Sequence, residues 1–295
     1  MWELVYVLKQ DNESSNSLDE RDTKHEKSSS LSQYRAEVAY WGTNFSGFQS
    51  QLSHNTVQDH LEKALTTLMR RPTKVLGASR TDSGVHAEKQ VFTFQSGISF
   101  SEENWLYSLS ALLPHSIKVK SIRPCAQDFH PIWHTKAKVY RYSLWLGPCL
   151  NPFIQDMVWT VPRNCRVDLI EKAALIFQGS HDFSSFCAKD THVKTKERTI
   201  FQVFIEKRGP LINLWFLGDG FLKQMIRIIV GTLVDLGVSR YTLDDVQKIL
   251  LAKDRRQAGQ TAAPNGLTLV DIFYEKVPTV EEIIQASLEG YSIRL

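Results

Sequence analysis

The stretch Leu76–Ala87 reads LGASRTDSGVHA, and it says more about fold and function than any other part of this 295-residue chain. It precedes an alternating run, Lys89–Gln95, that predicts a strand. Arg80 can hold a phosphate or displace a base, Asp82 can act as nucleophile or general base, and Gly84 lets the backbone turn. An acid on a tight turn beside a permanent cation is typical of a functional site. Asp-Ser-Gly alone is equally typical of a surface turn with an ion pair.

The composition allows a sizeable core, because 42% of the residues are hydrophobic. The length fits one large or two modest domains. A net charge of +3 and a pI near 8.6 are weak evidence for a polyanionic partner, since basic patches matter more than totals. The four cysteines include no CxxC pair, which argues against a zinc site or a disulfide framework and fits a reducing compartment.

The beginning of the chain gives no targeting signal. No apolar run is long enough to span a membrane, and Met1–Lys9 lacks the basic leader and cleavage site of a signal peptide. We therefore expect a cytoplasmic protein. Residues 10–33 contain almost nothing apolar, so we expect residues 1–33 to form a mobile polar extension, with the folded part beginning at Tyr34.

The rest of the chain alternates between strand and helix patterns. Strands are predicted over 34–40, 89–95, 117–122, 137–146, 198–206, 211–217 and 266–274. Helices are predicted over 57–69, 104–113, 167–178, 221–236, 242–252 and 279–288. This mixed order with hairpins predicts an α+β fold with a largely antiparallel sheet. We expect an N-terminal catalytic subdomain over 34–130 and a C-terminal subdomain over 131–295 that completes the site.

Two further patterns carry candidate chemistry. Alternation places Lys138, Tyr140 and Tyr142 on one face of a strand, where a tyrosine ring beside cations suits a base pulled from its stack, although an ordinary half-buried strand has the same pattern. Arg227 lies in an apolar helix and needs a carboxylate partner if it is buried. Asp82 is one candidate; Asp219, Asp235 or exposure to solvent are the others.

Other features are less specific. Two cation-rich loops, 189–198 and 253–256, could follow a phosphate backbone or be ordinary solvated loops. We expect His86 to be structural, with its ring bonded to nearby backbone, because no metal-ligand spacing surrounds it. The chain lacks a Walker loop, GxGxxG after a strand, HExxH and GxSxG, so we expect no nucleotide or metal cofactor.

Taken in order, five motifs resemble those of the TruA family of tRNA pseudouridine synthases, over most of the chain from about Tyr34 to Tyr274. They are Gly47–Gln49, Arg80–His86, Phe129–His130 with Lys138–Tyr142, Phe221–Gly231 and Pro264–Leu269. Three positions depart from the family's usual residues: Ser79 replaces Gly, Ser83 replaces Ala, and Trp41 stands where an Asp often precedes Gly42. Trp41 puts in doubt the backbone or the RNA contacts of the first loop.

The resemblance implies the pseudouridine synthase fold, a mixed sheet over two related subdomains flanked by helices, in a homodimer that acts on tRNA without a cofactor. The target uridines would lie in the anticodon stem-loop, at tRNA positions 38, 39 and 40. Asp82 would be the catalytic carboxylate, Tyr140 the ring packed on the target base and Arg227 the ion-pair partner of Asp82. Arg80 would displace the target from its stack, and Leu267 would bind substrate from the segment closing the pocket.

Two other functions compete with this one. The same fold could serve as an RNA-binding chaperone with little or no catalysis. An Asp-dependent nucleoside or glycoside hydrolase is the third possibility, although most glycosidases need a pair of carboxylates and Asp82 has no clear second acid in the motifs.

Overall fold

The structure, a computed structural model, describes residues 31–191 and 193–290. The predicted mobile extension therefore falls almost entirely on residues 1–30, outside the described part. The first strand begins at Ser32, two residues before the expected start. Gln33 belongs to it because its side-chain amide donates to the Phe129 carbonyl at 2.6 Å and its own carbonyl accepts from Cys125 at 2.9 Å.

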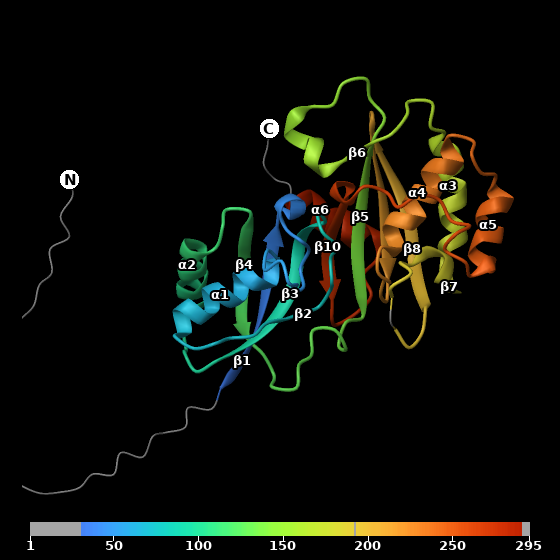
Figure 1. Ribbon diagram of the computed structural model, residues 1–295. Helices are drawn as coiled ribbons and strands as arrows, with labels where there is room; N and C mark the ends of the chain where they lie inside the picture. The colour runs from blue at the N-terminus through green and yellow to red at the C-terminus, as the bar shows by residue number, and fades with distance from the viewer. Residues whose placement is uncertain (1–30, 192, 291–295) are drawn as a thin grey trace, which may run out of the picture. The chain divides into compact units, whose positions relative to one another are not determined.

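The architecture is α+β, as the sequence predicted, and its centre is a ten-stranded mixed sheet (Figure 1). The strands are β1 (Ser32–Tyr40), β2 (Leu76–Gly77), β3 (His86–Ser96), β4 (Ile117–Pro124), β5 (Ala137–Trp145), β6 (Trp159–Thr160), β7 (Gly179–Asp182), β8 (Glu197–Arg208), β9 (Leu211–Gly218) and β10 (Leu267–Phe273). Their order is β4-β1-β3-β10-β5-β9-β8-β7, with β2 paired to β3 and β6 to β5. All pairs are antiparallel except β10 with β3 and β5 with β6.

The sheet runs without interruption through both expected subdomains. The last strand, β10, lies between β3 of the first segment and β5 of the second. Thr268 is level with His86, and Leu269 is opposite Tyr140. Strand β10 therefore joins the strands of the first segment to those of the second, directly beside the Asp82 loop. The division into subdomains at residue 130 stays a prediction.

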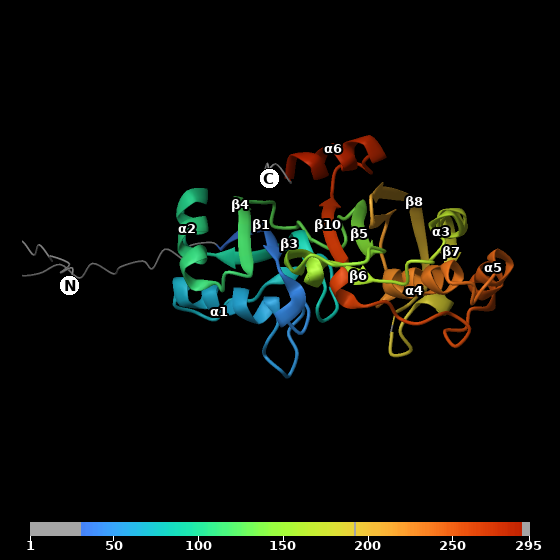
Figure 2. The ribbon, with the colours of Figure 1, turned by 90° about the horizontal axis from the view of Figure 1, so that it is seen from above.

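In the described part of the chain, six helices flank the sheet: α1 (Val57–Met69), α2 (Glu102–Leu112), α3 (Val167–Ala174), α4 (Met225–Gly237), α5 (Leu243–Ala252) and α6 (Val280–Gly290). Figure 2 shows α1 and α4 on one face and α6 on the other. Alternation along β5 explains both layers. Tyr140 and Tyr142 join the main core, whereas Val139 packs with Trp215 and Ile283 of α6 in a smaller cluster on the opposite face.

Local signals set most helix ends. Thr56 and Thr242 cap α1 and α5 in capping boxes with Asp59 and Asp245, as the sequence predicted for the second of them. Two helix predictions were too long. Residues 175–177 form a separate 3-10 turn after α3. α4 begins at Met225 rather than Phe221, because Gln224 adopts a left-handed conformation with φ of 61° that no helix interior accommodates.

Candidate active site

The Asp82 loop, residues 78–85, joins β2 to β3 and is held by contacts at almost every step. Gln90 brackets Ser79 by accepting from its N–H at 3.1 Å and donating to its carbonyl at 2.6 Å. The Thr81 hydroxyl is 2.8 Å from the Tyr40 hydroxyl, and the Thr81 carbonyl accepts from Phe48 at 3.2 Å. Asp82 is thus presented by a braced loop rather than by a free surface turn.

The segment before α1, residues 41–56, packs against this loop and supports it. Gly47 has φ of +93°, and a Cβ there would lie 2.6 Å from the Thr81 carbonyl oxygen. Gly84 has φ of +79°, as the expected turn requires, and its N–H donates to Phe45 at 3.2 Å. At Gly47, only glycine allows the two backbones to approach this closely at a positive φ, and a Cβ at Gly84 would lie 2.9 Å from the Pro264 side chain.

Arg227 supplies the partner of Asp82. Its Nη1 donates to Asp82 Oδ2 at 2.9 Å, and its Nε donates to the Ala262 carbonyl at 2.9 Å. Both side chains are mostly shielded from solvent, at 12% exposure for Arg227 and 18% for Asp82. The two alternative partners are engaged elsewhere: Asp235 pairs with Arg240, and Asp219 accepts from the Thr199 N–H. The ion pair fixes one carboxylate oxygen and leaves the other side of the carboxylate for a ligand.

Tyr140 lies near Asp82 at the centre of β5. Its hydroxyl is 2.8 Å from the Ser79 hydroxyl, and its ring packs nearly perpendicular to that of Phe221, with centroids 5.3 Å apart. Burial raises the pKa of Tyr140 to about 12, and the charge of Asp82 adds to that effect against the Ser79 hydrogen bond. The hydroxyl is therefore neutral near pH 7 and serves as a hydrogen-bonding group rather than an anionic base.

Lys138, which the sequence analysis placed on the same strand face as Tyr140, also contacts the Asp82 loop. Its Nζ donates to the Ala78 carbonyl at 2.8 Å. Lys138 and Tyr140 thereby hold two consecutive residues of the Asp82 loop, Ala78 and Ser79. Burial, with a smaller contribution from Arg198, lowers the pKa of Lys138 to about 8. Strand alternation had placed these two residues on one face, and what the sequence did not signal was their contact with Ala78 and Ser79.

The remaining predicted residues have less direct positions. Arg80 is an exposed residue of the Asp82 loop, and among the described residues it forms no hydrogen bond or ion pair, so its guanidinium is open to a ligand. Leu267 is buried at the start of β10, opposite Tyr142 rather than Tyr140. Leu267 is therefore two residues away along β10 from Leu269, the residue that lies opposite Tyr140.

The three departures from the family pattern have structural counterparts. The Ser79 hydroxyl makes the contact with Tyr140, which a glycine could not make. The exposed Ser83 hydroxyl donates to the Phe45 carbonyl at 3.2 Å. The Trp41 ring packs edge-on against the His86 ring, with centroids 5.0 Å apart. These three residues therefore stabilise the loops around the site.

His86 has the structural role expected for it. Its Nδ1 accepts from the Gly42 N–H at 3.0 Å, and its Nε2 donates to the Asp156 carbonyl at 2.7 Å. Burial lowers its pKa, so the ring is neutral and joins two loops. Among residues 31–191 and 193–290, no three His, Cys, Asp or Glu side chains gather to hold a metal ion. No helix in the same ranges is long and apolar enough to cross a membrane.

Comparisons with known proteins identify the family of this chain. The tRNA pseudouridine synthase family matches residues 36–133 and 173–275, which include Asp82 and Arg227, whereas Tyr140 lies between the two matched ranges. The chain is 39% identical over 240 residues to tRNA pseudouridine synthase A of Bacillus licheniformis, covering 81% of this chain and 97% of that protein. It is 38% identical over 249 residues to tRNA pseudouridine synthase A of Geobacillus kaustophilus, covering 84% and 96%.

A solved structure of a Cbf5-Nop10-Gar1 complex aligns with 84% of this chain and 54% of that chain at a TM-score of 0.31 and 11% identity, a likeness too weak to add to the assignment. The family match and the relatives decide it. The chain belongs to the tRNA pseudouridine synthase family, a family of isomerases.

Proposed function

We propose that this chain isomerises uridine to pseudouridine in tRNA, with Asp82 as the catalytic carboxylate. The observation that carries the proposal is the shielded 2.9 Å ion pair between Asp82 and Arg227, which joins a braced loop to the first turn of α4. Two relatives that align with more than 80% of this chain are named tRNA pseudouridine synthase A. The finer assignment to positions 38, 39 and 40 of the anticodon stem-loop, a homodimer and a cytoplasmic location rest on the family resemblance.

The reaction needs a group of this kind. Isomerisation breaks the bond from N1 of uracil to C1′ of the ribose, turns the base and joins C5 to C1′. C5 loses its proton to solvent, and N1 takes up a proton. A carboxylate serves either by attacking the sugar or base or by stabilising charge at C1′ while the first bond breaks. Arg227 holds the carboxylate in one orientation, and the reaction involves no net oxidation or reduction.

The other residues have roles that suit an extruded base. The target must leave its stack, which costs a few kcal/mol. Arg80 is exposed at the edge of the loop, where it can occupy the space that the base vacates. The Tyr140 ring, held by Ser79 and Phe221, provides the surface that keeps the detached uracil beside the sugar. Leu267 completes the apolar surroundings next to Tyr142.

The test is release of tritium from tRNA carrying tritium at C5 of uridine, with the Asp82→Ala variant alongside. We expect release by the natural chain and a loss of at least about 1000-fold in the variant, with tRNA binding nearly unchanged because phosphate contacts dominate affinity. Binding lost together with turnover would contradict the role of Asp82.

The same assay separates the competing functions. No release across a panel of tRNAs, with binding intact, would favour the RNA-binding chaperone. Free uracil in the supernatant would favour a hydrolase.

A further inference from the structure

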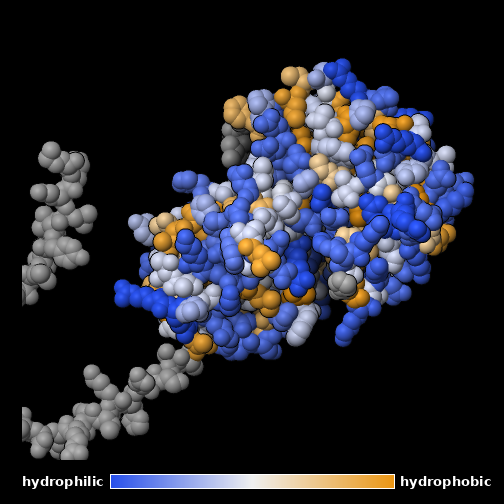
Figure 3. Space-filling model, in the orientation of Figure 1, coloured by the Kyte–Doolittle hydropathy of each residue, from blue (hydrophilic) through white to orange (hydrophobic). Residues whose placement is uncertain are grey.

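The two cation-rich loops noted in the sequence come together in one hollow, which the site described above does not use. Its lining comes from three segments: Ala188–Asp190, Lys223–Gln224 and Arg255–Arg256. The hollow has a volume of about 470 Å³, and a smaller one next to it shares the first and third segments. Figure 3 shows strongly hydrophilic residues gathered on the part of this face where α3, α4 and α5 lie.

Positive charge predominates in the two hollows. Six basic side chains line them, against the two acids Asp190 and Asp254: Lys189, Lys196, Lys223, Lys253, Arg255 and Arg256. Three of the bases are paired with a carboxylate: Lys223 with Asp190, Arg256 with Asp254, and Lys253 with Asp182. In the described part of the chain, Lys189 and Arg255 form no ion pair with a carboxylate within 4 Å, so their charge is available to an anion.

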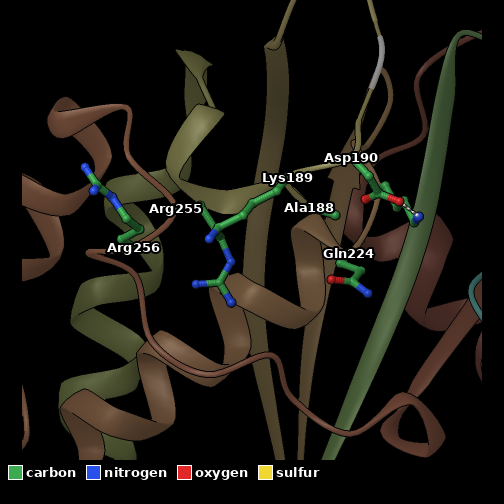
Figure 4. A pocket seen from close by; sticks show the side chains of 7 residues that line it. Ala188, Lys189, Asp190, Gln224, Arg255 and Arg256 are labelled. Carbon is green, nitrogen blue, oxygen red and sulfur yellow. Dashed lines mark hydrogen bonds and ion pairs between the residues drawn. The ribbon is translucent and has the colours of Figure 1, made fainter.

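Lys189 and Arg255 point toward a common space. Figure 4 shows their side chains approaching each other, with Gln224 across the hollow and Arg256 directed away. Arg255 is held in place by hydrogen bonds from its guanidinium to the Ala258 carbonyl at 3.2 Å and to the Thr261 hydroxyl at 3.0 Å. A fixed guanidinium facing an exposed ammonium suits one phosphate group.

The walls of the hollow are tied together by the backbone. The Ala188 N–H donates to the Lys223 carbonyl at 3.1 Å. The Asp254 N–H donates to the Ser185 hydroxyl at 2.8 Å, and that hydroxyl donates to the Ile249 carbonyl at 2.6 Å. The cations therefore stand on a framework that is formed before any ligand binds, which lowers the entropy cost of binding.

Two of these segments lead directly to Asp82. Lys223 and Gln224 precede α4, whose first turn carries Arg227. The loop that begins with Arg255 continues to Ala262, which accepts from Arg227 Nε and whose N–H donates to the Arg227 carbonyl at 3.0 Å. The partner of Asp82 is thus held between the two segments that form the hollow.

We infer that this hollow binds a backbone phosphate of the RNA, one that flanks the target nucleotide, through Lys189 and Arg255. The inference rests on the proposed function, since it assigns the substrate's phosphate to a place beside the same centre. The N-terminus of α4 adds the positive end of its helix dipole, since its N-cap residue, Gln224, lines the hollow. The Gln224 side chain makes no capping hydrogen bond to the first N–H groups of the helix. Binding here holds the RNA against these preformed walls, next to Arg227, while the target base enters.

The test uses two variants of the full chain, Lys189→Glu and Arg255→Lys. The second variant keeps the positive charge but loses the forked N–H donors of the guanidinium. Lys120→Glu, an exposed lysine on β4 at the other end of the sheet, is the matched control. The probes are a tRNA that the natural chain isomerises and a short hairpin from it that contains the target uridine. We measure filter binding over a range of salt concentrations and single-turnover tritium release.

We expect Lys189→Glu to weaken binding of both RNAs by about tenfold or more and to reduce the salt slope by about 1, with single-turnover release at saturating RNA changed little. Arg255→Lys should weaken both RNAs by a smaller factor, and Lys120→Glu should match the natural chain. Sulfate at millimolar concentration should displace RNA from the natural chain more effectively than from the Lys189→Glu variant.

Two results would overturn the inference. One is equal binding and salt slope for Lys189→Glu and Lys120→Glu. The other is a defect with whole tRNA but none with the hairpin, which would place the phosphate in a remote arm. Failure of the proposed function looks different, because the natural chain itself would then release no tritium from any tRNA.

Discussion

The Asp82 centre and the basic hollow hold charge in opposite ways, although Arg227 and the first turn of α4 connect them. At the centre, an acid and a base from segments 145 residues apart are shielded and matched one to one. In the hollow and its smaller neighbour, six bases face two acids, and among the described residues Lys189, Lys196 and Arg255 form no ion pair with a carboxylate. The first arrangement positions a reacting group, and the second suits a ligand that brings its own negative charge.

The largest effect should come from breaking the matched pair. Arg227→Ala removes both the contact with Asp82 and the contact with Ala262, so we expect turnover to fall by about 100-fold or more. The free energy of unfolding should fall by about 2 kcal/mol. This loss is smaller than for a fully buried pair, because both side chains retain some exposure. Single-turnover tritium release and urea unfolding measure the two effects.

A surface ion pair serves as the control for that prediction. Arg166 and Asp168 lie 2.7 Å apart and are more than half exposed, so Arg166→Ala should leave turnover and the melting temperature unchanged. Equal losses in the two variants would show that the Asp82 pair has no special role.

A smaller effect should follow from disturbing the support of the Asp82 loop. Gly47→Ala places a Cβ 2.6 Å from the Thr81 carbonyl at a backbone φ of +93°, and it should cost about 1–3 kcal/mol of stability and lower turnover by moving Asp82. Gly209→Ala is the matched control, because that glycine also has positive φ, +59°, but a Cβ there meets nothing within 4 Å. Thermal unfolding and single-turnover rates of the two variants decide the matter. A drop in stability at Gly47 without any change in rate would separate the loop from the chemistry.

The smallest change near neutral pH concerns the cation at the centre, Lys138. The pKa of Lys138 is about 8 in the folded chain, against an ordinary value of 10.5. Between these two pH values the unfolded chain binds more protons, so this group makes the free energy of unfolding rise with pH from about 8 upward; below that it contributes no further change. NMR titration of chain carrying ¹³C at lysine Cε should show a resonance moving near pH 8 that is missing from Lys138→Arg. A spectrum in which the resonance lost in Lys138→Arg stays still from about pH 7 to 9 would contradict the prediction.

Local patterns in the sequence predicted a large part of this molecule. Alternation gave β5 and its tyrosine face, capping residues gave the start of α5, and the Arg-Thr-Asp-x-Gly-Val-His stretch identified the candidate centre. These succeed because strand alternation, caps and turns depend on residues within a few positions of one another. The start of α4 was wrong because Gln224 adopts a left-handed conformation, which its residue type does not signal.

The sequence by itself determined that an acid, a tyrosine and an arginine of the right kinds are present, and it left three carboxylates open as partners for Arg227. Only the tertiary structure decided among them, by pairing Asp235 with Arg240 and placing Asp82 against Arg227. It also brought Lys189 and Arg255 together from loops more than 60 residues apart in the chain. The physical reason is that such contacts depend on how the sheet and helices pack, and packing joins residues whose separation in sequence carries no information about their distance in space.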